Sequence, residues 1–355
     1  MMSILSDRLI RWDRAEKPEE LFGCDTSLTI VELKKRYRKL LLEVHPDHNP
    51  AEKQLAEKAF FLLQKWYDIA VKKLDSKSYG RSPIIEIVSK NNRYVGYQEP
   101  VSGDLSDIFC ASDQHACQVI IKILHHPKNN DLIAAEKRSI QIINRQLALD
   151  PLRPHFPTFI EQVKLKDKNG AERLANVLML EKGTYSLADV KRRFPSGVDP
   201  ADGAWMFHRL LAGLAKTHEL GLVHGAVLPT HLLIRPEDHN GILIDWCYSV
   251  EIGDRIQAIS PPYQHYYPPE VLAKRPASAA TDVYMAAMTM LEILGGDGKR
   301  GQPSPQTPPL MAALLKSCLI QSPHRRPQDA WEVFEQSHSI CKKLFGKPVF
   351  REFEM

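Results

Sequence analysis

A single proline separates two charged, amphipathic runs near the start of the chain and determines how they can fold. Pro46 stands between His45 and Asp47 in the segment "EVHPDHNP". Because proline has no amide hydrogen and its ring collides with the preceding helical turn, a helix does not continue through it. The two runs are therefore predicted to be separate helices, joined by a rigid turn that exposes an imidazole and a carboxylate.

The run before the turn carries a helix-start signature. Thr29 and Glu32 have the capping-box spacing, in which each side chain bonds the other residue's amide. Apolar residues then recur at steps of three and four, which places them on one face: Ile30, Leu33, Tyr37, Leu40 and Val44. The cations of this run point mostly elsewhere: Lys34, Lys35, Arg38 and Lys39.

The run after the turn predicts a second helix from about Ala51 to Leu74. Its apolar stripe consists of Leu55, Ala59, Leu62, Leu63, Trp66 and Ala70. Two such helices joined by a short loop bury their stripes against each other as an antiparallel hairpin. A short helix around 18–22 is expected to close one end of it.

This constellation resembles the J-domain, the part of DnaJ-type co-chaperones that binds DnaK-type heat-shock chaperones. The matching stretch is "VELKKRYRKLLLEVHPDHNP", followed by the long second helix, and the resemblance covers about residues 18–74. It implies that His45, Pro46 and Asp47 dock on the chaperone's ATPase domain and trigger ATP hydrolysis. The basic helix docks with them, since a cationic face steers an encounter with an acidic surface.

The composition changes after this region. The first domain is predicted at 1–74, with its core at 18–74, and "DSKSYGRSP" at 75–83 is an expected linker because it is rich in Ser, Gly and charge. A second domain follows at 84–345, with a tail at 346–355. Its first half consists of short β-rich segments with one helix, and from about 186 it is mainly helical. The predicted fold class is α+β, with a small sheet-rich lobe before a larger helical lobe.

The motifs of the second domain, taken in order, resemble protein kinases over residues 90–340. "VIIK" ends in Lys122, and Glu136 on the next helix can pair with it. "LMLEKG" resembles the hinge between kinase lobes and contains Glu181, and "ILIDWCYS" resembles the magnesium-binding turn with Asp245. Three further matches imply structural roles in the large lobe: Glu270 in "YYPPEVL", Asp282 in "SAATDVY" and Arg326 in "SPHRRPQ".

The departures from that pattern predict an inactive kinase-like domain, a pseudokinase. The resemblance places the catalytic acid at Ala226, the catalytic lysine at Leu228 and a magnesium ligand at His231. A methyl group cannot orient a substrate hydroxyl, and imidazole is a poor ligand for magnesium, which prefers oxygen. Phosphoryl transfer depends on placing charge around its transition state. We therefore expect no catalytic residues in this chain.

The surviving Lys122, Glu136 and Asp245 allow two interpretations. They hold a nucleotide, with Glu181 beside the adenine and ATP with magnesium as the ligand, or they are a structural ion cluster. The loop that would cover the phosphates keeps only Gly103 and carries Asp104 and Asp107, which would repel a triphosphate. The sequence leaves both interpretations open.

Composition narrows the cellular setting and the kinds of partner that we expect for this chain. The six cysteines are scattered without a Cys-x-x-Cys pair, which is typical of reduced thiols in a cytosol and indicates neither a disulfide frame nor a zinc site. No apolar run approaches the roughly 18 residues of a membrane span, and a net charge of +4 over 355 residues gives no nucleic-acid signature. We expect a cytoplasmic protein with no metal, membrane or nucleic-acid partner.

These observations lead to one function and one alternative. The chain is predicted to be a co-chaperone that stimulates a DnaK-type chaperone, with the kinase-like domain binding an unknown protein client. The alternative is an atypical phosphotransferase, or a nucleotide-gated scaffold, that uses Lys122 and Asp245.

Overall fold

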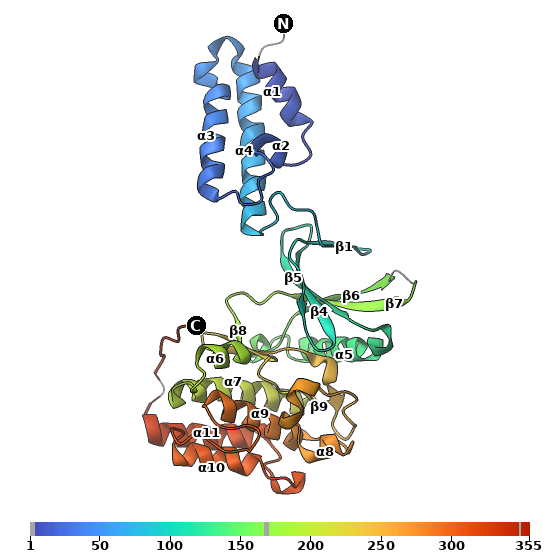
Figure 1. Ribbon diagram of the computed structural model, residues 1–355, viewed down its shortest axis with the longest axis vertical. Helices are drawn as coiled ribbons and strands as arrows, with labels where there is room; N and C mark the ends of the chain where they lie inside the picture. The colour runs from blue at the N-terminus through green and yellow to red at the C-terminus, as the bar shows by residue number, and fades with distance from the viewer. Residues whose placement is uncertain (1–3, 167–169, 348) are drawn as a thin grey trace. The chain divides into compact units, whose positions relative to one another are not determined.

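The computed structural model describes residues 4–166, 170–347 and 349–355, and its chain divides into two compact units. The first unit contains the described residues up to Val101 together with Phe109–Gln118, and the second contains the rest. The boundaries between the units fall within β3 (Val101–Ser102), β4 (Ser106–Ser112) and β5 (Gln118–Leu124). The chain is a mixture of helices and sheet, as the sequence predicts, and its N-terminal part is helical (Figure 1).

The first unit begins with helices and ends in strands. Its helices are α1 (Ile4–Asp13), α2 (Glu19–Phe22), α3 (Ile30–Val44) and α4 (Lys53–Asp75), with the short 3-10 turns η1 (Pro46–His48) and η2 (Pro50–Glu52). β1 (Ile85–Val88) pairs antiparallel with β2 (Arg93–Gly96), and β2 pairs with the end of β4 (Ser106–Ser112).

Helices α3 and α4 form the predicted hairpin (Figure 1). The Thr29–Glu32 capping box starts α3, and α3 ends at Val44, two residues before Pro46. The buried core contains Leu33, Val44, Ala59, Leu63, Trp66 and Ala70. Ile30 is wrong as a core prediction, because at the first helical position it is 47% exposed.

Helix α1 is a third helix of this core that the sequence analysis did not assign. It packs along α4, where Trp12 is only 1% exposed and its carbonyl accepts a hydrogen bond from Trp66 Nε1 at 3.0 Å. The expected linker also contributes, since Tyr79 is buried and its hydroxyl donates to the carbonyl of Gly23 at 2.8 Å. The hairpin is thus supported by segments before and after it in the chain.

The second unit combines a sheet with a helical body. Its strands are β5 (Gln118–Leu124), β6 (Phe159–Lys166), β7 (Glu172–Met179), β8 (Tyr185–Ser186), β9 (Leu222–Val223), β10 (Leu232–Arg235), β11 (Asn240–Leu243) and β12 (Val250–Glu251), after β3 (Val101–Ser102). Its helices are α5 (Asn130–Gln146), α6 (Leu187–Arg193), α7 (Pro200–Glu219), α8 (Pro269–Leu272), α9 (Ala279–Ile293), α10 (Pro309–Cys318) and α11 (Ala330–Phe345).

Two features of the second unit position its polar side chains. β7 pairs antiparallel with β5 and with β6, in a register that sets Lys122 opposite Asn176. Helix α9 lies inside the helical body, between α7 and α10, and nearly all of its residues are buried. A helix that is apolar on all sides is expected at the centre of a large core. Every helix among the described residues is too short or too polar to cross a lipid bilayer.

Candidate functional site

The turn between α3 and α4 holds His45, Pro46 and Asp47 in a fixed shape. His45 Nδ1 accepts a hydrogen bond from the amide of Asp47 at 3.2 Å, so a neutral ring carries its proton on Nε2. The side-chain amide of Asn49 donates to the carbonyls of Glu43 at 3.1 Å and His45 at 3.0 Å. These bonds satisfy carbonyls that the end of α3 leaves free.

The acid of the turn is available to a partner. The side chain of Asp47 is 84% exposed, and that of His45 is 37% exposed. The ring of Phe60 on α4 meets the His45 ring edge to face, with centroids 6.2 Å apart, and so supports it from the hairpin side. The turn therefore presents a preformed carboxylate next to an oriented imidazole.

The basic face of α3 adjoins this turn. Lys34, Lys35, Arg38 and Lys39 are all exposed, and among the described residues none of the four forms an ion pair. Their positions are related by three and four residues, so they form one stripe. Arg36 lies apart from them, because its guanidinium donates to the carbonyl of Phe22 at 2.5 Å. The stripe keeps its full positive charge for a partner.

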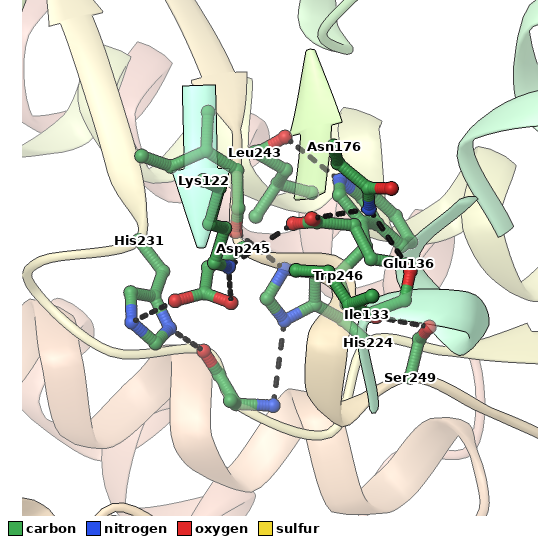
Figure 2. Close-up of polar contacts among 12 residues, drawn as sticks. Lys122, Ile133, Glu136, Asn176, His224, His231, Leu243, Asp245, Trp246 and Ser249 are labelled. Atoms are coloured by element: carbon green, nitrogen blue, oxygen red, sulfur yellow. Dashed lines mark hydrogen bonds and ion pairs between the residues drawn. The ribbon is translucent and has the colours of Figure 1, made fainter. Parts of the chain in front are cut away.

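A second group of charges lies buried in the second unit (Figure 2). Lys122 Nζ on β5 is 3.1 Å from Glu136 Oε1 on α5 and 2.5 Å from Asp245 Oδ1. Burial alone would lower the pKa of the Lys122 ammonium, but the neighbouring carboxylates, led by Asp245, hold it well above its usual value. The structure thus brings together three of the four predicted nucleotide-binding residues as an ion cluster.

His231 occupies the other side of Asp245. Its Nε2 lies 3.3 Å from Asp245 Oδ2, and its Nδ1 bonds the carbonyl of Ala226 at 2.8 Å. Burial raises the pKa of the Asp245 carboxyl, but the charges of Lys122 and His231 reverse this effect and hold that pKa well below its usual range. Each carboxylate oxygen of Asp245 therefore already has a partner from the chain itself.

The surroundings of the cluster offer little to a metal ion. Glu136, Asp245 and Cys247 bring ligand atoms within 4.8 Å of one another. The ammonium of Lys122 bonds all three side chains, so a cation of the protein already lies where a metal ion would bind. Burial raises the pKa of the Cys247 thiol well above its ordinary value, which keeps the sulfur protonated. This donor set does not fit magnesium, which takes several oxygen ligands and keeps water.

The loop 224–226 is built around buried backbone contacts. Asp282 on α9 accepts the amides of His224 at 2.7 Å and Gly225 at 2.9 Å. Gly225 has a φ of +75°, and a Cβ there would lie 2.6 Å from the carbonyl oxygen of Tyr248, so a larger residue does not fit. Burial lowers the pKa of His224 to about 4, which makes it a neutral structural residue.

Two side-chain contacts of this region gave no signal in the sequence. Asn176, fully buried opposite Lys122, donates to Glu136 Oε2 and to the carbonyl of Ile133, both at 2.9 Å, and so orients the acid (Figure 2). Asp104 accepts a hydrogen bond from the buried Ser260, which ties the loop after β3 to the segment after β12. Neither partner could be found from sequence spacing, because each pair joins distant elements.

The remaining predicted residues lie outside the cluster. Glu181 pairs with Arg235 at 3.1 Å and not with any of the three cluster residues. Burial raises the pKa of the Glu181 carboxyl. Glu270 and Arg326 form a bidentate pair at 2.6 and 2.8 Å. These two residues and Asp282 are buried in the helical body, and their structural roles stay a prediction.

Comparisons with known proteins concern the first unit. Residues 20–79 match the family model described as DnaJ domain. "Chaperone protein DnaJ" of Ehrlichia ruminantium (strain Gardel) is 40% identical over 62 residues, covering 18% of this chain and 16% of that protein. "DnaJ homolog subfamily B member 8" of Homo sapiens is 44% identical over 50 residues, covering 14% and 22%.

A further relative has the same partial coverage. "Chaperone protein DnaJ" of a Nitratiruptor species is 31% identical over 93 residues, covering 25% of this chain and 23% of that protein. The chain thus spans between 16% and 23% of the length of these curated relatives. The family match includes α3, the His45–Asp47 turn and α4, and it extends to Tyr79. Residues 20–79 of this chain are a DnaJ domain.

Proposed function

We propose that this chain is a co-chaperone that recruits a DnaK-type chaperone and stimulates its ATP hydrolysis. The observation that carries the proposal is the turn at His45, Pro46 and Asp47, held in a fixed shape within a stretch that matches the DnaJ domain. The exposed carboxylate of Asp47 and the oriented imidazole of His45 are the trigger. The unpaired cations of α3 attract an acidic face of the chaperone and raise the rate of encounter.

The second unit is, in this proposal, a protein kinase-like domain without phosphotransfer activity. A buried methyl group at Ala226 replaces the acid that would orient a substrate hydroxyl. Asp245 is held by Lys122 and His231, so both of its oxygens already have partners within the chain. The domain instead binds a protein client, and covalent linkage to the DnaJ domain raises the local concentration of the chaperone at that client.

Charge reversal on α3 tests the docking step. Replacing Lys35 and Arg38 by Glu should weaken binding to a purified DnaK-type chaperone at least about tenfold at low salt, because two attractions become repulsions. The measurement is calorimetric titration of the full chain at two ionic strengths. The matched control is charge reversal of Lys72, in the last turn of α4, and of Lys77, just after α4. Both lie at the end of α4 away from the His45 turn, and their reversal should leave the affinity for the chaperone unchanged. Equal weakening by both pairs would contradict a specific docking face.

A second function rests on the buried Lys122–Glu136 pair, which an ATP-using domain would also need. In that case the chain is an atypical phosphotransferase or a nucleotide-gated scaffold. Labelled ATP with magnesium separates the candidates, because the first proposal expects neither label transfer to any acceptor nor a change in melting temperature at millimolar ATP. Label transfer lost in Asp245→Asn would establish the phosphotransferase, and a melting shift without transfer would establish the scaffold.

A further inference from the structure

A cavity of about 520 Å³ opens in the helical body, apart from the Lys122 cluster. It lies between α7, α11, the loop that joins β10 to β11, and the segment after α11. Helices α7 and α11 run side by side (Figure 1). Its volume is within the range of sites that bind small molecules, roughly 300–1,000 Å³. No role in the co-chaperone proposal accounts for it.

Stacked rings form one wall of the cavity. Trp205 on α7 and His239 stack with ring centroids 4.2 Å apart and an angle of 5° between planes. Phe350 stacks on the same imidazole at 4.3 Å. His239 also has a φ of +53°, an uncommon backbone conformation for a residue other than glycine. The imidazole is thus stacked on by two aromatic rings, and the backbone that positions it is held in an unfavourable conformation.

A half-buried guanidinium supplies charge inside the cavity. Arg209 Nε donates to the carbonyl of His239 at 2.8 Å, and no carboxylate among the described residues pairs with Arg209. Asp238 also lines the cavity, but its oxygens bond Arg235 and the amide of Asn240, each at 3.0 Å. The positive charge of Arg209 is therefore not compensated by the protein.

Two histidines that line the cavity do not share its positive charge. Burial, with a smaller effect from the charge of Arg209, lowers the pKa of His208 to about 4, and burial likewise lowers the pKa of His239. Arg209 is thus the interior cation of the cavity, with Lys342 and Lys347 among its exposed lining residues.

We propose that this cavity binds a small organic anion with a flat aromatic ring, such as an aromatic carboxylate, sulfonate or phosphate. The acidic group lies at Arg209, and the ring packs against the aromatic wall that Trp205 and Phe350 form with His239. Aromatic walls supply most of the contact area, and the few polar groups fix the orientation, which is the usual division of labour in small-molecule sites.

A pair of dyes tests the charge requirement on the full chain. 8-Anilinonaphthalene-1-sulfonate is an aromatic anion, and N-phenyl-1-naphthylamine is its neutral analogue. We expect one saturable site for the anion, at least about tenfold tighter than for the neutral dye, because a charged hydrogen bond to Arg209 is made only by the anion. Equal affinity for both dyes, or no saturable binding of the anion, would overturn the proposal.

Variants locate the bound anion. Arg209→Gln should weaken it about tenfold or more, and Phe350→Leu, which keeps apolar bulk but removes the ring, should weaken it several-fold. Lys343→Gln is the control, because Lys343 follows Lys342 on α11 but does not line the cavity. If Arg209→Gln lowers the melting temperature, Phe350→Leu decides the result, since Phe350 is 59% exposed and its replacement leaves no polar group unpaired. Unchanged anion affinity in Phe350→Leu, or equal loss in Lys343→Gln, would contradict the assignment.

Discussion

Replacement of Arg326 by Met should lower the free energy of unfolding of the second unit by about 3–5 kcal/mol, the usual cost of breaking one partner of a buried pair. The Arg326 side chain is fully buried, and its guanidinium donates two hydrogen bonds to the Glu270 carboxylate, at 2.6 and 2.8 Å. The same guanidinium donates to three carbonyls, those of Ile320, Ala280 and Gln321. Without it, a buried carboxylate and three backbone carbonyls lose this donor at once.

The neighbouring arginine gives a matched control for this prediction. Arg325 is exposed, and Arg325→Met should change stability by about 0.5 kcal/mol or less. Urea denaturation followed by hydrogen exchange of α8 and α9 measures both variants. Arg326→Lys should cause most of the same loss in free energy of unfolding, because lysine keeps the charge but cannot donate the two parallel hydrogen bonds of a guanidinium. If Arg326→Met were as stable as Arg325→Met, the pair would not hold the helical body together.

Replacement of Lys122 by Met should also destabilise the second unit by about 3 kcal/mol or more. The substitution leaves Glu136 and Asp245 buried near each other without the ammonium that separates them. The effect should be measured by urea denaturation in the absence of nucleotide, because the account treats the cluster as complete without a ligand. Lys164→Met is the control, since Lys164 and Glu172 form an exposed pair worth about 1 kcal/mol or less.

Removing all three charges of the cluster tests whether unpaired charge causes the loss of stability in Lys122→Met. In a triple variant with Lys122→Met, Glu136→Gln and Asp245→Asn, no uncompensated charge remains, and much of the lost stability should return. A triple variant less stable than Lys122→Met alone would show that packing, not charge, explains the loss. A loss below about 1 kcal/mol for Lys122→Met would contradict the role of the ammonium itself.

Local signals allowed the hairpin of the first unit to be predicted from the sequence. The Thr29–Glu32 box and Pro46 act within a few residues, so they set the start and the end of α3 without help from the rest of the chain. The second helix begins at Lys53, because Pro50–Glu52 forms a separate 3-10 turn. Helix α1 was not predicted, because its stability depends on the contact of Trp12 with α4 rather than on a capping signal.

The buried cluster shows the limit of sequence reasoning. Lys122, Glu136 and Asp245 were predicted together, and they do meet. The partner that completes the cluster, His231, appeared in the sequence only as a poor magnesium ligand. Its contact with Asp245 depends on the left-handed backbone of Asp245, with a φ of +63°, and on the carbonyl of Ala226. Such geometry is set by tertiary packing and leaves no periodic signal.

The central claim is that the turn at His45 triggers a partner's ATP hydrolysis. Its most direct test is the steady-state ATPase rate of a purified DnaK-type chaperone with the full chain, with His45→Gln and with His324→Gln, an exposed histidine far along the sequence. The account predicts stimulation by the unmodified chain and by His324→Gln, and none by His45→Gln at equal melting temperature. Equal stimulation by His45→Gln would contradict it.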